Sequence, residues 1–167
     1  MNSSRKNQGF SLIELLLAVA IIAMLAGMAI PSLGNTVAEA EVSTLRQELQ
    51  RVRTAVDYYA FQHSDQFPGW DGAHWSQAAF QSQLLLGTDE DGKWARVGTP
   101  GFPYGPFLTE SMPSNRFNLL STVLLVSQSA TFAGPTDQTG WVFFTDTGIF
   151  KANSSATAPD GTPVYEL

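Results

Sequence analysis

The sequence contains no cysteine, which excludes disulfides, thiolate metal sites and a cysteine nucleophile. Basic residues are also few, with 9 Lys and Arg against 15 Asp and Glu, and the net charge is −6. No basic cluster is present that could neutralise phosphates, so we exclude nucleic-acid binding. The only histidines, His63 and His74, have no carboxylate at a metal-ligand spacing. Phosphate-binding glycine loops and nucleophile elbows are absent as well. We therefore expect a protein that is not an enzyme.

A long apolar segment occupies residues 10–30, and Glu14 is the only charged residue within it. As a helix this segment would be about 30 Å long, the thickness of a bilayer core. Arg5 and Lys6 precede it, and no basic residue follows until Arg46. This asymmetry predicts a single membrane-spanning helix with residues 1–9 in the cytoplasm and the rest of the chain on the other side.

Glu14 limits how this segment can be interpreted, because a carboxylate in hydrocarbon costs about 2.5 kcal/mol or more. A cleaved secretory signal is one interpretation, with residues 27–29 as a loose small-x-small site, but the segment is long for a signal core. A plain anchor is the second, and it leaves the cost of Glu14 unexplained. The third takes in the whole arrangement. A basic leader ends in Gly9, Phe10 follows, Glu14 stands four positions later, and Pro31 closes the apolar run.

These residues resemble the N-terminus of the type IV pilin and type II secretion pseudopilin superfamily, through the motif Gly9-Phe10-Ser11-Leu12-Ile13-Glu14. The resemblance implies that a prepilin peptidase cuts between Gly9 and Phe10 and methylates the new amine of Phe10. That amine could meet Glu14 of a neighbouring copy where little water is present, and the attraction would favour one register. We therefore expect Phe10, Glu14 and Pro31 to serve assembly, with a kink near residues 27–31.

Beyond residue 31 the pattern stays helical, with an apolar stripe at helical spacing. Its members are Val42, Leu45, Leu49, Val52, Val56 and Tyr59. We expect a leader over residues 1–9, a transmembrane and assembly helix over 10–31, a spine helix over 32–63, and a head over 64–167. A second helix is predicted over 75–86, a strand over 122–127, a hairpin over 140–153 and a loose tail over 154–160. The fold class is α+β: a pilin-like long helix on a small antiparallel sheet of about three strands.

The head also resembles the pseudopilins, of the major, G-like kind, through "LQRVRTAVDYYAFQHSDQFPG" and "GPFLTESMPSNRFN". That resemblance implies calcium in a C-terminal loop, but Asp137, Asp146 and Asp160 are scattered, so we expect no cofactor and leave structural calcium as an alternative. The middle region is rich in aromatic residues. We interpret these as packing residues rather than a platform for sugars: Trp70, Trp75, Trp94, Phe102 and Tyr104.

The resemblance implies a structural subunit of a type II secretion pseudopilus, held in the bacterial inner membrane with its head in the periplasm. Its expected partners are further copies of itself, minor pseudopilins, the prepilin peptidase, and an inner-membrane platform with its ATPase. A type IV pilus or DNA-uptake subunit shares every N-terminal feature, although the absence of a cysteine pair favours the pseudopilin. A membrane-anchored periplasmic binding or enzymatic domain remains a further alternative.

Overall fold

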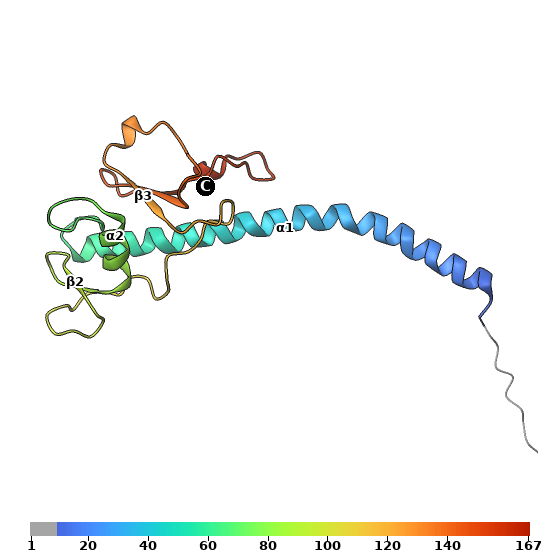
Figure 1. Ribbon diagram of the computed structural model, residues 1–167, viewed down its shortest axis with the longest axis horizontal. Helices are drawn as coiled ribbons and strands as arrows, with labels where there is room; N and C mark the ends of the chain where they lie inside the picture. The colour runs from blue at the N-terminus through green and yellow to red at the C-terminus, as the bar shows by residue number, and fades with distance from the viewer. Residues whose placement is uncertain (1–9) are drawn as a thin grey trace, which may run out of the picture. The chain divides into compact units, whose positions relative to one another are not determined.

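The computed structural model describes residues 10–167, apart from the side chains of residues 27–35. The chain divides into two compact units, Met1–Ala38 and Glu39–Leu167. The long helix of Figure 1, α1, covers Leu12–Gln62 and contributes to both. Within the part of the chain that the structure describes, no helix combines the length and the hydropathy needed to cross a membrane.

The C-terminal part of α1 forms the spine of the head, and its apolar stripe is buried as predicted. Leu45, Val52 and Val56 are completely buried, and the other members of the stripe are at most 4% exposed. The helix ends where two residues take left-handed backbone angles, Ser64 at φ 55° and Asp65 at φ 63°. The Asp65 N–H then bonds back to the Ala60 carbonyl at 2.9 Å, and the His63 N–H bonds to the same carbonyl at 3.1 Å, which closes the last turn of the helix. The predicted end near residue 63 is thus confirmed.

A short second helix, α2 (Gln77–Leu85), follows the loop after α1 and confirms the helix predicted over residues 75–86. Ser76 is its N-cap, because the Ser76 Oγ accepts a hydrogen bond from the Ala79 N–H at 3.1 Å. Phe80 and Leu84 are fully buried in the core of the head. The cap fixes where the helix begins, and these two side chains fix which face it buries.

The head contains two small sheets. Strands β1 (Gly87–Thr88) and β2 (Trp94–Ala95) form an antiparallel pair shortly after α2. Strands β3 (Val123–Val126), β4 (Trp141–Phe144) and β5 (Phe150–Ala152) form a three-stranded sheet with β4 in the middle. Short 3₁₀ turns, η1 (Ser129–Thr131) and η2 (Val164–Glu166), complete the elements. The α+β class, the predicted strand and the predicted hairpin are confirmed.

One pairing differs from the predicted antiparallel sheet. Strands β4 and β5 are antiparallel as expected, but β3 runs parallel to β4, with Val123 opposite Trp141. Parallel neighbours need a connection of about a dozen residues or more, and residues 127–140 provide one. Asp146 holds this crossover at its start, because its Oδ2 accepts hydrogen bonds from the Ser129 N–H at 2.8 Å and the Ser129 hydroxyl at 2.7 Å.

Aromatic side chains fill the core between α1 and the three-stranded sheet. Trp141, Phe143 and Phe150 are completely buried, and the Phe143 ring lies 4.8 Å from that of Phe80. Burying one such side chain contributes about 1.5–3 kcal/mol. The sheet is small, so these few large rings supply much of the surface that the head removes from water.

Buried amide side chains join loops that are distant in the sequence. Gln83 accepts a hydrogen bond from the Gly69 N–H at 2.6 Å and donates to the carbonyls of Trp70 and Gly92 at 2.8 and 2.7 Å. Asn153 donates to the hydroxyls of Thr136 and Thr139 at 3.0 and 2.7 Å. In a chain without cysteine, these amides act as the cross-links between loops.

The predicted loose tail over residues 154–160 is wrong, because this segment packs against the head. Ser154 and Ala158 are buried, and Val164 beyond them has no exposed surface. The Arg53 guanidinium on α1 donates to the Phe150 carbonyl at 2.9 Å and to the Leu167 carbonyl at 3.0 Å. Small polar residues suggested mobility, whereas the bonds of Ser155 to the Asp137 carboxylate and the burial of Ser154 and Ala158 hold the segment in place.

Candidate assembly site

The N-terminal end of α1 carries the residues predicted for processing and assembly. Phe10 is 84% exposed, and Ser11 stands just before the helix. The Glu14 Oε2 accepts a hydrogen bond from the Ser11 N–H at 2.9 Å. This is one half of a capping box, in which the third helical residue reaches back to the N-cap. Ser11 was missed as a functional residue, although the signal, Ser-x-x-Glu before an apolar run, is present in the sequence.

The capping contact gives Glu14 a role within its own chain. A carboxylate near a helix N-terminus is favourable, because it faces the positive end of the helix dipole. A carboxylate has two oxygens and about four acceptor positions, and the Ser11 bond uses only one of them. Glu14 can therefore cap its own helix and still accept a further hydrogen bond from another group.

The first turns of α1 expose their large apolar side chains on every side. All of the large apolar side chains from Phe10 to Leu25 are at least 50% exposed. A continuous apolar surface of this kind marks a site for lipid or for another protein. Gly9 and the side chain of Pro31 lie outside the described part of the chain, and the backbone of residues 27–31 is helical. The kink predicted there stays a prediction.

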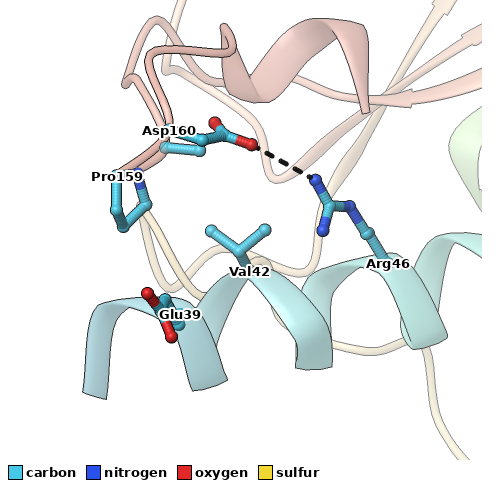
Figure 2. A pocket seen from close by; sticks show the side chains of 6 residues that line it. Glu39, Val42, Arg46, Pro159 and Asp160 are labelled. Atoms are coloured by element: carbon cyan, nitrogen blue, oxygen red, sulfur yellow. Dashed lines mark ion pairs between the residues drawn. The ribbon is translucent and has the colours of Figure 1, made fainter. Parts of the chain in front are cut away.

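In the head, a hollow of about 210 Å³ lies between α1 and the loop that carries Asp160. Figure 2 shows Arg46 and Asp160 pointing toward one another beside Val42, with Glu39 on the preceding turn. Arg46 and Asp160 form an ion pair at 3.9 Å, and both side chains are more than half exposed. The hydrogen bond from the Thr162 N–H lowers the pKa of Asp160, and Arg46 adds to that effect. The hollow holds no nucleophile paired with a base.

The C-terminal aspartates do not fit the calcium site that the resemblance implies. Asp137 is bonded to the N–H and hydroxyl of Ser155, which lower its pKa. Asp146 is bonded to Ser129, and Asp160 to Thr162 and Arg46. Calcium needs six to eight oxygens that converge, whereas each carboxylate here serves its own loop. Among the described residues, no group of three or more His, Asp or Glu side chains could hold a metal ion.

The two histidines occupy different environments and do not form a common site. His63 is 2% exposed, its Nδ1 lies 2.8 Å from the Tyr59 carbonyl oxygen, and its ring stacks on that of Tyr59 at 3.9 Å. His74 is exposed and pairs with Asp71 at 3.1 Å. Hydrogen bonds from the His74 and Ala73 N–H groups lower the pKa of Asp71. His63 is a packing residue, and His74 belongs to an exposed turn.

Comparison with known proteins agrees with the geometry at the start of α1. Residues 4–30 match the family model described as the prokaryotic N-terminal methylation motif. The chain carries the N-terminal segment of the type IV pilin and pseudopilin superfamily. The similarity thus lies in the N-terminal segment, and the motif there implies an N-terminal hydrophobic anchor.

Three individual proteins are similar to part of this chain. A type IV major fimbrial protein FimA of Dichelobacter nodosus is 39% identical over 40% of this chain and 45% of its own length. Another FimA of that organism is 46% identical over 30% of this chain and 31% of its own length. The prepilin peptidase-dependent protein D of Escherichia coli (strain K12) is 38% identical over 35% of this chain and 40% of its own length. The alignments span less than half of each relative. No solved structure gave a significant match.

Proposed function

We propose that the chain is a structural subunit of a type II secretion pseudopilus and not an enzyme. The observation that carries this proposal is the placement of Glu14. Its carboxylate lies at the start of an exposed apolar helix, within hydrogen-bond distance of the Ser11 N–H and one turn from Phe10. The prepilin peptidase would cut between Gly9 and Phe10 and methylate the Phe10 amine.

Removal of the leader converts the Phe10 backbone nitrogen from an amide into a charged amine. In an assembled filament, apolar surface from neighbouring copies would surround this end of the helix and lower the local dielectric. The Phe10 amine of one copy would then pair with Glu14 of another, while Oε2 of that Glu14 keeps its bond to Ser11. Because leaving a charge buried without a partner costs about 3–5 kcal/mol, this pair would select a single register between copies.

The apolar segment, the spine and the head would each have a different location in the filament. The exposed apolar side chains of α1 up to Leu25 would lie in the inner membrane before assembly and against other copies afterwards, with Pro31 at the end of this segment. The head over residues 64–167, with the spine over 32–63, would stand in the periplasm. Minor pseudopilins, an inner-membrane platform and its ATPase are the proposed partners that add subunits to the filament.

A type IV pilus subunit is the second candidate, because two of the relatives are named as type IV major fimbrial proteins. Their similarity covers only 40% and 30% of this chain, and both kinds of filament use the N-terminal segment. The absence of cysteine favours the pseudopilin, since no disulfide loop can form. A DNA-uptake subunit fits less well with a net charge of −6.

Intact-mass and N-terminal analysis of membrane-fraction protein, with and without prepilin peptidase, tests the processing step. We expect a mature chain that begins at N-methylated Phe10 only when the peptidase is present. A chain that keeps residues 1–9 beside an active peptidase would contradict the proposal. So would a chain that begins near Ile30, because signal peptidase would then have released a domain without its apolar segment.

A further inference from the structure

Two tryptophans of the head lie at its surface instead of in its core. Trp70 is 39% exposed and Trp75 is 36% exposed. Their rings lie 5.7 Å apart at an angle of 59°, and the two residues pair through an antiparallel bridge. The two indoles thus pack on one another within their loop, and they are not part of the core. An exposed indole forgoes the large gain of burial, so its position calls for an explanation.

The loop that carries both indoles is held rigidly by hydrogen bonds. The Gly69 N–H bonds to the buried Gln83 side chain at 2.6 Å, and the Ser76 N–H bonds to the Gly69 carbonyl at 2.9 Å. Gly69 has φ +118°, and a Cβ there would come within 2.8 Å of Leu125 and 3.2 Å of the Trp75 ring. The backbone that carries the indoles is thus held before any ligand arrives, which reduces the entropy that binding would cost.

The indoles line a pocket of about 350 Å³ together with four other residues: Asp65, Gln66, Phe67 and Thr145. Phe67 is anchored in the core, since its ring contacts Phe143 edge-on at 6.2 Å. Gly148 leaves room for the Phe67 ring, because a Cβ at that position would collide with it. The pocket therefore has aromatic walls on fixed backbone, with polar side chains at its edge.

The polar groups of this pocket differ in what they can donate and accept. The Asp65 carboxylate accepts, whereas the Gln66 amide and the Thr145 hydroxyl both donate and accept. No hydrogen bond of the Asp65 or Gln66 side chain is found among the described residues, and the Thr145 hydroxyl reaches only the Val126 carbonyl at 3.5 Å. A ligand rich in hydroxyl groups satisfies such a mixture, while an ammonium group would use acceptors alone.

We propose that this pocket binds a carbohydrate. A pyranose ring would lie against the Trp70 and Trp75 indoles, and Asp65, Gln66 and Thr145 would bind its hydroxyl groups. An aromatic face covers the C–H groups of a sugar, and a few placed polar groups give it orientation, as in other small-ligand pockets. The site lies wholly within the head, so it does not depend on filament assembly.

The test is a titration of the full chain in detergent with chitohexaose, cellohexaose and maltohexaose, followed by isothermal titration calorimetry. We expect saturable binding of at least one of these sugars. Because few anchor residues carry most of a binding energy, Trp70→Ala or Trp75→Ala should weaken it about tenfold or more. Asp65→Ala and Gln66→Ala alter exposed side chains and should weaken it by about threefold each. Phe61→Ala, an exposed aromatic outside the pocket, should leave it within about twofold.

Three results would overturn the proposal. The first is no saturable binding of any of the three sugars. The second is binding that Trp70→Ala, Asp65→Ala and Gln66→Ala all leave unchanged. The third is tryptophan-dependent binding of tetramethylammonium in place of the sugars, which would make the pocket a cation site. If Trp75→Ala fails to fold, Asp65→Ala and Gln66→Ala still test the proposal, because they alter exposed side chains.

Discussion

The helix α1 contains two segments that bury apolar surface in different ways. From Leu12 to Leu25 its large apolar side chains are at least half exposed, whereas from Val42 to Tyr59 the apolar stripe is buried against the head. The first segment is apolar on all sides, and the second on one side only. The apolar residues of the second segment are thus covered by the core of the head. The apolar residues of the first segment have no such cover, and we expect lipid or another protein to supply it.

The largest expected effect comes from the core of the head. Phe143→Ala should lower the free energy of unfolding by about 3–5 kcal/mol, because it leaves a cavity beside Phe80. Leu16→Ala, in the exposed segment, should change it by less than about 0.5 kcal/mol. Denaturant titration of the full chain in detergent, followed by the fluorescence of the buried Trp141, measures both. If both variants lost the same free energy of unfolding, the exposed segment would contribute to stability as much as the core of the head, which would contradict this comparison.

The next effect concerns the buried amide that joins two loops. Gln83→Ala should cost about 1–3 kcal/mol, because it leaves the Gly69 N–H and two carbonyls without their partner. Hydrogen exchange at Gly69 should become faster at the same time. Gln47→Ala, at an exposed position of α1, is the matched control and should have little effect. If the two variants behaved alike, Gln83 would not be a cross-link.

Acid should weaken the head through its loop aspartates. Hydrogen bonds from Ser155 and Ser129 lower the pKa values of Asp137 and Asp146 in the folded state. A lowered folded pKa contributes stability above the unfolded value of about 3.9, and this stability is lost as the pH falls through the folded value. Melting temperatures should therefore drop below about pH 4. The double variant D137N/D146N should show a smaller drop, and an unchanged drop would contradict this assignment.

The smallest effect is expected at the hollow of Figure 2. Asp160→Asn removes an exposed ion pair with Arg46, and such pairs contribute at most about 1 kcal/mol. The loss should shrink further at high salt, because salt screens exposed charges. Thermal melts at low and high salt measure this change. A loss that salt leaves untouched would show that packing of the loop, and not the ion pair, is responsible.

The sequence allowed much of the fold to be predicted, because its strongest signals are periodic. The stripe from Val42 to Tyr59 predicted the spine helix, and the turn residues 145–148 predicted the hairpin of β4 and β5. The parallel pairing of β3 with β4 could not be read from sequence, since strand direction depends on the path of the crossover through residues 127–140. The packed tail was missed for a similar reason, because its contacts, such as that of Asp160 with Arg46 on α1 and that of Ser155 with Asp137, are distant in sequence.

At the candidate site, the sequence identified Glu14 as unusual but gave only an intermolecular reason for it. The structure adds the bond to Ser11, which follows from local capping geometry. The two surface tryptophans were assigned to packing because composition does not reveal which side of a loop faces water. Their exposure depends on the Gln83 bonds to Gly69 and Trp70, and these join residues more than ten positions apart.

The central claim is that the charge of Glu14, and not only its cap, directs assembly. Comparing filament formation by Glu14→Gln and Glu14→Ala tests it most directly, since glutamine keeps the bond to Ser11 but carries no charge. We expect both variants to lose assembly by about a hundredfold or more, because each leaves the Phe10 amine without its partner. Normal filaments from Glu14→Gln together with a defect in Glu14→Ala would contradict the account and show that Glu14 acts only as a helix cap.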